Sequence, residues 1–264
     1  NGGELDSFLI EITANILRFR DEDGKPLLDK ILDVAGQKGT GKWSAIAAMD
    51  ENDPLTLITE AVYARLLSAL YPERIKAASL YSGKLKVESG KLSDNAQLSI
   101  EDVRQALYAA KLISYAQGFS LLRHASEHYG WDLDYGTIAR IWRKGCIIRS
   151  VFLQKITEAY RKDPDLENLL FDDFFHTKIQ EALPAWRRVV AEGALSGVAL
   201  PAMSSALNYF DGLRTLYSAA NMIQAQRDYF GAHTYERTDR ERGHFFHTNW
   251  TGEGGNTVSG TYSV

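Results

Sequence analysis

A glycine-rich loop at residues 36–43 carries the residues of this chain that are best suited to chemistry. Its sequence, Gly-Gln-Lys-Gly-Thr-Gly-Lys-Trp, alternates glycines with Lys38, Thr40 and Lys42. Glycine lets backbone N–H groups approach an anion closely, while the lysines add positive charge and the threonine adds a hydroxyl donor. A loop of this kind is suited to a phosphate or another oxyanion. A flexible surface turn is the alternative that the loop residues alone leave open.

The same residues make a poor nucleotide P-loop. Gly36 to Lys42 match the pattern G-x-x-x-x-G-K, but Trp43 occupies the position of the magnesium-binding Ser or Thr. A P-loop also follows a buried strand and opens a helix. The apolar positions of residues 27–34 are instead spaced as in a short helix. The sequence therefore disfavours ATP or GTP binding.

Three further cations occupy unusual positions. Arg65 lies in a mostly apolar helical pattern with alanine four residues before and after it, so no helix ion pair accounts for it. Its guanidinium must find an anion or extend to solvent. Arg227 and His233 flank the expected end of a helix at Gly231, from which either could reach a ligand. Cations near a helix C-terminus are also simply stabilising, so the pattern alone leaves both interpretations open.

Other reactive residue types have simpler interpretations. His244 and His247 have helical spacing but no nearby cysteine and no matching acid pair, so we expect no metal site. Gly118 lies inside a long helical pattern, where glycine costs about 1 kcal/mol against alanine. A close helix crossing explains Gly118 better than a ligand contact. No Ser/His/Asp or Cys/His spacing indicates a nucleophile, and Cys146 lies among apolar residues.

The composition is that of a globular chain with a sizeable core. The 264 residues are 45% hydrophobic and carry a net charge of −4, which argues against general nucleic-acid binding. The single cysteine excludes an intrachain disulfide and favours a reducing, cytoplasmic location. We expect no membrane span and no signal peptide. The chain opens at Asn1 without a methionine, which we interpret as a cut.

Helical periodicity dominates the first part of the chain. Apolar residues recur with helical spacing over residues 5–17. A second strong pattern follows Pro54, and Pro72 opens a further short stretch. Residues 81–98 are rich in Gly, Ser and Lys and are expected to form a connecting loop.

The longest helical pattern lies in the middle of the chain. Ser99 and Asp102 have the spacing of a capping box, and the helix that follows would run to about His128 and stop at Gly130. No clear alternating strand pattern occurs. The sequence therefore predicts an all-α fold, a large helical domain built around a long central helix. Further helical patterns cover residues 134–143, 146–161, 173–192 and 201–229.

The end of the chain differs in composition from the rest. Few apolar residues follow Trp250, and such a segment cannot bury enough surface to order itself. We therefore expect a helical domain over residues 1–233 and an extended C-terminal tail over residues 234–264 that reaches a partner subunit. A homodimer is the hypothesis that this tail motivates.

Five segments have unusual compositions, and all resemble one family. They are residues 1–13, 36–43, 115–119, 226–233 and 247–252. In order along the whole chain, they are similar to the decarboxylating 6-phosphogluconate dehydrogenases of the pentose phosphate pathway. That family has an N-terminal Rossmann domain that binds NADP, a large all-helical domain, and a tail that threads into the partner subunit of a homodimer. The resemblance covers only the helical domain and the tail.

The resemblance implies roles for the unusual cations. Lys38 and Thr40 would contact the sugar phosphate, and Arg65 would be a further cationic contact. Arg227 and His233 would be contributed across the dimer interface to the same substrate. The implied reaction is oxidation of 6-phosphogluconate at C3 by NADP, followed by decarboxylation and tautomerisation to ribulose 5-phosphate.

The resemblance also limits what this chain is expected to do by itself. It implies that the Rossmann domain lies upstream of Asn1, together with the segment that carries the catalytic lysine and glutamate. Hydride transfer needs the cofactor domain, and proton transfer needs that acid and base. We therefore expect no catalytic residue within this chain and no turnover by the chain alone.

Two other interpretations predict different properties. Another 3-hydroxyacid dehydrogenase would share a helical second domain, but the glycine loop with its lysine and the His-Thr-Asn-Trp segment disfavour it. A helical interaction module would bind no small molecule. That interpretation leaves the family match at the four cations unexplained.

Overall fold

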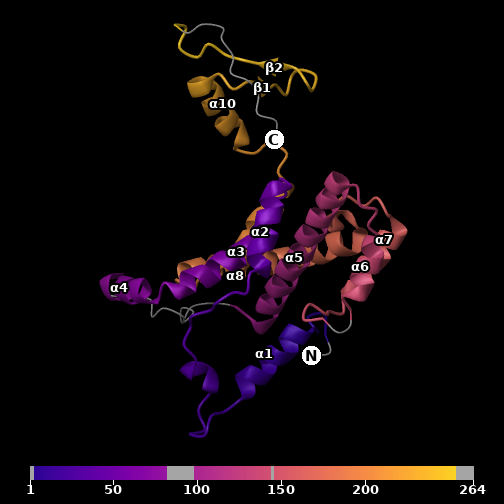
Figure 1. Cartoon of the computed structure of the whole chain (residues 1–264). Coiled ribbons are helices and arrows are strands. Elements are labelled where there is room, and N and C mark those ends of the chain that lie inside the picture. Colours follow the sequence, from indigo (N-terminus) through magenta and orange to yellow (C-terminus); the bar gives the residue numbers. More distant parts are fainter. Residues whose placement is uncertain (1–2, 82–97, 144–145, 254–264) are drawn as a thin grey trace. The chain divides into compact units, whose positions relative to one another are not determined.

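The computed structural model describes residues 3–81, 98–143 and 146–253, and helices dominate it (Figure 1). The chain divides into two compact units, Asn1–Phe210 and Asp211–Val264. This division falls before residue 233, where the sequence places the end of the helical domain. The last helix belongs to the second unit with the hairpin that follows it. Most of the connecting loop predicted at residues 81–98 lies outside the described residues.

The first unit begins with short helices, and the periodicity predicts all of them except the helix over residues 40–50. Ser7 caps the first helix by accepting a hydrogen bond from the Ile10 N–H at 3.5 Å. Pro72 lies in the first turn of a helix, where its missing N–H costs little. The elements are α1 (Phe8–Arg18), the 3-10 helix η1 (Leu27–Lys30), α2 (Thr40–Asp50), α3 (Thr56–Ala69) and α4 (Tyr71–Tyr81).

The long helix α5 (Ile100–Tyr129) is confirmed with both of its predicted ends. The Ser99 hydroxyl accepts from the Asp102 N–H at 3.0 Å, and the Asp102 carboxylate accepts from the Ser99 N–H at 2.9 Å. Gly130 ends the helix with a φ of 66°, a left-handed value that favours glycine. The sequence therefore fixes the start and the stop of the central helix.

The core forms where α5 packs against the helices that follow it. Ile113 and Phe119 of α5 and Trp186 of the longest partner helix are fully buried. Burial of large apolar side chains is the main favourable term in folding. Among these helices, α5 packs mainly on α8 (Asp173–Leu195) and the 3-10 helix η2 (Leu169–Phe171). Residues of α6 (Tyr135–Ile141), α7 (Leu153–Lys162) and α9 (Pro201–Leu213) complete the core.

Tertiary pairing shortens the helix predicted at residues 146–161. Phe8 N–H donates to the Arg149 carbonyl at 3.4 Å, and Val151 N–H donates to the Asp6 carbonyl at 3.2 Å. These bonds hold Ser150 extended opposite Ser7, so α7 begins only at Leu153. The prediction was therefore wrong for residues 146–152, because pairing with the first residues of the chain overrides the apolar pattern.

The helix predicted over residues 201–229 is two helices. α9 ends at Leu213, and α10 (Ala220–Gly231) starts after a turn. The Ser218 hydroxyl accepts from the Ala220 N–H at 3.3 Å, a local bond with which serine competes against a continuing helix. After α10, β1 (Tyr235–Glu236) and β2 (Phe245–Phe246) pair antiparallel, a hairpin too short for its strand pattern to be read from the sequence.

Candidate functional site

The glycine loop ends in a helix start that is suited to an anion. Gly39 has a φ of 108°, which favours glycine, and it leads directly into α2. No side chain caps this helix start, and its first turn holds no acidic residue. The first N–H groups of a helix have no partner within it, and they carry the positive end of the helix dipole. Lys38 and Thr40 are exposed beside these groups, so an anion meets backbone donors, a hydroxyl and an ammonium together.

Two glycines of the loop lie close to neighbouring side chains. A Cβ on Gly41 would lie 2.7 Å from Cγ2 of Val62, so α2 can approach α3 this closely only at a glycine. A Cβ on Gly39 would lie 3.3 Å from the Trp43 ring. The loop therefore has a packed geometry, unlike a free surface turn.

Arg65 reaches this loop from α3. Its Nη2 donates a hydrogen bond to the carbonyl oxygen of Gly36, although the residue is exposed to solvent. A guanidinium has further N–H donors besides this one. The structure thus brings Arg65 to the first residue of the loop that holds Lys38 and Thr40, and the contact that it shows is with the backbone.

A cavity of about 580 Å³ opens beside Thr40. It runs along α5 and is mostly apolar, and Gly118 lies in its wall. A Cβ on Gly118 would meet no atom within 4 Å. The expectation of a close helix crossing at Gly118 was therefore wrong, because open space and not a neighbouring helix faces this glycine. The other lining residues are Ser7, Leu9, Ser44, Ile58, Lys111, Ser114, Tyr115, Trp142, Ile147, Ile148 and Arg149.

Lys111 is a residue of this cavity that the sequence analysis missed. Its Nζ donates to the Ser150 hydroxyl at 3.1 Å and lies 5.1 Å from the centre of the Phe152 ring. Burial lowers the pKa of Lys111 to about 8, and Asp6 opposes this shift only in part. Burial also raises the pKa of Tyr115 to about 12. The signal in the sequence was a lysine between two apolar residues, Ala110 and Leu112, both of which are buried in the structure.

The second unit holds the other two predicted site residues. Arg227 Nη1 donates to the Gln224 side chain at 2.7 Å, and the His233 N–H donates to the Arg227 carbonyl at 3.4 Å. The C-cap in the left-handed region is Ala232, with a φ of 49°, and not Gly231 as predicted. A Cβ on Gly231 would lie 2.7 Å from the His233 ring, so the present position of this ring depends on the glycine. The end of α10 thus brings Arg227 and His233 together.

Asp228 connects this helix end to the segment after the hairpin, and the sequence analysis missed it. The carboxylate is fully buried. Its oxygens lie 2.8 Å from His247 Nδ1, and they accept from the Thr248 N–H at 3.0 Å and the Trp250 indole N–H at 2.8 Å. Burial acts to raise the pKa of Asp228, but these three donors outweigh it and lower the pKa below its ordinary value. The signal in the sequence was an acidic residue within the segment of residues 226–233, whose composition is unusual.

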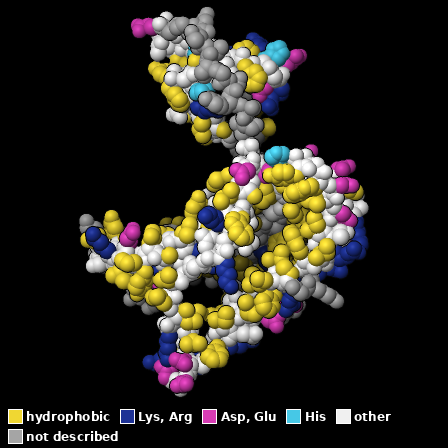
Figure 2. All heavy atoms as spheres, in the orientation of Figure 1, with side chains coloured by type: hydrophobic (Ala, Val, Ile, Leu, Met, Phe, Trp, Pro, Cys, Tyr) yellow, Lys and Arg dark blue, Asp and Glu magenta, His cyan; other side chains and the backbone are white. Residues whose placement is uncertain are grey.

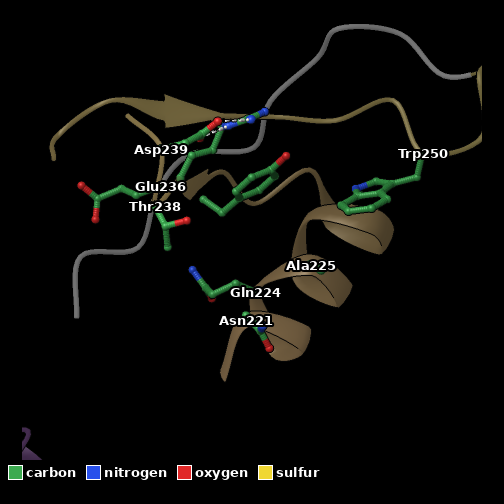
Figure 3. A pocket seen from close by; sticks show the side chains of 9 residues that line it. Asn221, Gln224, Ala225, Glu236, Thr238, Asp239 and Trp250 are labelled. Carbon is green, nitrogen blue, oxygen red and sulfur yellow. Dashed lines mark hydrogen bonds and ion pairs between the residues drawn. The ribbon is translucent and has the colours of Figure 1, made fainter. Parts of the chain in front are cut away.

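A second cavity, of about 690 Å³, lies between α10 and the hairpin. Figure 3 shows Asn221 and Gln224 on the helix side, Thr238 and Asp239 on the hairpin side, and Trp250 at one end. The Asp239 carboxylate accepts two hydrogen bonds from Arg237, both of 2.7 Å. Because this guanidinium is already paired, the cavity is less suited to an anion than the glycine loop.

Two searches of the described residues bear on other ligands. No group of three or more His, Cys, Asp or Glu side chains in residues 3–81, 98–143 and 146–253 could hold a metal ion. Within the same residues, no helix has the length and apolar character that crossing a bilayer requires.

Comparison with known proteins identifies relatives along the whole chain. The family model described as 6-phosphogluconate dehydrogenase, C-terminal domain, matches residues 1–250. The chain is 56% identical over 264 residues to 6-phosphogluconate dehydrogenase, decarboxylating, of Rattus norvegicus, covering 100% of this chain and 54% of that protein. It is 53% identical over 266 residues to the protein of the same description in Treponema pallidum (strain Nichols), with the same coverage of both chains.

A solved structure is similar as well. Plasmodium falciparum 6-phosphogluconate dehydrogenase, described in its apo form, with its cofactor NADP+ and with its substrate 6-phosphogluconate, matches with a TM-score of 0.85 and 42% identity. The match covers 95% of this chain and 53% of that one. This chain therefore spans about half the length of the relatives that it matches.

Proposed function

Because the chain belongs to the 6-phosphogluconate dehydrogenase family, we propose that it supplies the substrate-binding and dimerisation part of such an enzyme. The activity of the whole enzyme is then the NADP-dependent oxidative decarboxylation of 6-phosphogluconate to ribulose 5-phosphate. In this proposal the glycine loop binds the phosphate of the substrate. The groups that transfer the hydride and the protons come from outside this chain.

The convergence of donors at the glycine loop is the observation that carries the proposal. The loop leads into the uncapped start of α2, its Lys38 and Thr40 are exposed, and Arg65 of the neighbouring helix contacts its first residue, Gly36. A phosphate presents several anionic oxygens, and hydrogen bonds to ionised groups are about twice as strong as neutral ones. Clamping the phosphate fixes the position of the sugar, and this is how binding energy contributes to orientation for hydride transfer.

Arg227 and His233 complete the substrate site from a second copy of the chain in this proposal. They belong to a separate compact unit from the loop, and α10 presents large apolar side chains to solvent, with Phe230 76% and Met222 61% exposed. The first unit also presents many hydrophobic side chains at its surface (Figure 2), among them Trp43 and Met49 at 66% each. Large exposed apolar patches mark protein interfaces, which supports a homodimer.

NADP is the cofactor that we propose for the whole enzyme. The residues described here do not fit a dinucleotide: their strands form the β1–β2 hairpin, so they offer no βαβ unit. We therefore assign none of these residues to the cofactor. We further propose a cytoplasmic location, which rests on the single cysteine.

A calorimetric titration of this chain with three ligands tests the substrate assignment. We expect 6-phosphogluconate to bind, gluconate to bind much more weakly because it lacks the phosphate, and ATP not to bind. Equal binding of gluconate and 6-phosphogluconate would show that the loop does not recognise phosphate. Binding of ATP in preference to the sugar phosphate would restore the P-loop interpretation.

A further inference from the structure

The backbone that leads into the glycine loop lies against α3 and the start of α4. Residues 33–36 belong to no helix or strand, yet their polar backbone atoms are held by three side chains of these two helices. Arg65 and Ser68 come from α3, and Arg74 comes from α4. We call these three side chains the backbone clamp.

Ser68 joins the incoming segment to the helix that carries Arg65. Its hydroxyl accepts from the Ala35 N–H at 2.9 Å and donates to the Arg65 carbonyl at 2.7 Å. One hydroxyl thus uses both its donor and an acceptor position, which only serine or threonine among small residues allows. Because Ala35 precedes Gly36, this bond fixes the residue next to the carbonyl that Arg65 contacts.

Arg74 holds the same segment two residues earlier. Its Nη1 donates to the Asp33 carbonyl at 3.2 Å and to the Ser68 carbonyl at 3.1 Å. Its Nη2 forms an ion pair with the Asp33 carboxylate. A planar guanidinium with several fixed donors suits such a junction of two chain segments. Arg74 therefore ties Asp33 to the helix turn that contains Ser68.

From these contacts we propose that Ser68 and Arg74 are positioning residues for the phosphate loop. Both act through the backbone of residues 33–36, which sets where Lys38 and Thr40 stand relative to Arg65. The inference rests on the proposed function, because it assigns the clamp to the affinity of that same site. Supporting residues that do not touch a ligand still determine its binding when they lock the residues that do.

Four single variants of the full chain test this inference. Ser68→Ala removes the hydroxyl, Ser68→Thr keeps it, and Arg74→Gln removes the fork of donors. Ser204→Ala serves as the matched control, because it removes a helix serine of α9 far along the chain. For each variant we would measure the dissociation constant for 6-phosphogluconate and the amide hydrogen exchange of Ala35 and of α5.

We expect Ser68→Ala and Arg74→Gln to raise the dissociation constant roughly tenfold, the effect of losing a hydrogen bond of ordinary strength. Exchange at Ala35 should accelerate in Ser68→Ala while exchange in α5 stays unchanged, which a general loss of stability would not produce. Ser68→Thr should keep both the dissociation constant and the exchange rate at Ala35 close to the wild-type values. Ser204→Ala should change neither of these two quantities.

Two outcomes would overturn the inference in different ways. If the wild-type chain binds the sugar phosphate and Ser68→Ala binds it equally well, the positioning role is wrong and the proposed function stands. If the wild-type chain binds no sugar phosphate, the proposed function fails, and the positioning role fails with it.

Discussion

The guanidinium of Arg65 donates a hydrogen bond to the carbonyl oxygen of Gly36, 29 residues earlier in the chain. This contact joins α3 to the first residue of the glycine loop. It places a permanent positive charge at the first residue of the loop that leads into the start of α2, a helix start that favours anions. The two features that looked odd in the sequence, a glycine-rich loop and an arginine without a helix partner, are therefore parts of one structure.

Lys38 is expected to contribute more to phosphate binding than Lys42. Replacing Lys38 with alanine should weaken 6-phosphogluconate binding by about 1.5–3 kcal/mol, the usual contribution of a hydrogen bond to a charged group. In the intact enzyme the same change should raise KM more than it lowers kcat. Lys42→Ala is the matched control, and a smaller effect is expected there. Equal effects of the two changes would remove Lys38 from its assigned role.

Asp228 should control the stability of the second unit at low pH. Replacing it with asparagine puts an amide group against the groups that donate to the Asp228 carboxylate. We therefore expect the free energy of unfolding to fall by about 2 kcal/mol. Its folded-state pKa lies below the ordinary value of 3.8, so the stabilisation is present above pH 3.8 and disappears as the pH falls through the folded value. The indole N–H resonance of Trp250 reports this transition, because that group donates to the carboxylate.

The Asp228→Asn variant provides its own control for this pH dependence. Its Trp250 resonance should already resemble the acid form at neutral pH and should change little on acidification. A wild-type-like resonance in the variant would contradict the account of the three donors.

Gly118→Ala should stabilise the first unit. Alanine is favoured over glycine in a helix by about 0.5–1 kcal/mol, and a Cβ on Gly118 meets nothing within 4 Å. Gly41→Ala makes the matched contrast, because its Cβ would lie 2.7 Å from Val62 and would push α2 away from α3. Thermal unfolding should show a higher melting temperature for Gly118→Ala and a lower one for Gly41→Ala. A lower melting temperature for Gly118→Ala would show that a close neighbour occupies the cavity.

Lys111 should make the stability of the first unit depend on alkaline pH. Its pKa falls from 10.5 to about 8 on folding, so between these values the unfolded chain binds more protons than the folded chain. The free energy of unfolding should therefore rise as the pH increases above about 8. Tyr115 reverses the trend only above its ordinary pKa of 10.0, because folding raises its own pKa. In denaturant unfolding, the Lys111→Met variant should not show this rise in the free energy of unfolding. If the variant still shows it, a group other than Lys111 causes the pH dependence.

The sequence predicted the parts of this fold that depend on local signals. Ser99, Asp102 and Gly130 mark the ends of α5 by their own hydrogen bonds and backbone angle. α2 was missed because its apolar residues do not gather on one face. The shortening of α7 and the break before α10 follow from pairing and turns, which periodicity does not encode.

The candidate site could be predicted only in part for a similar reason. Lys38, Thr40 and Arg65 were proposed from the sequence because their types are unusual at their positions, and their role in binding stays a prediction. Asp228 and Lys111 were missed because their importance comes from burial and from partners that are distant in sequence, such as Trp250 for Asp228. Such contacts exist only once the chain has folded.

The most direct test of the central claim, a substrate site shared between two copies of the chain, is a mixed dimer of Lys38→Ala and Arg227→Ala chains. With differently tagged chains purified in tandem, each dimer would contain one site that carries both changes and one site that carries neither. Calorimetry should then show 6-phosphogluconate binding with wild-type affinity at about half the wild-type stoichiometry, while each single-variant preparation binds weakly. If the mixed dimer binds as weakly as the single variants, Lys38 and Arg227 do not complete one site across two subunits.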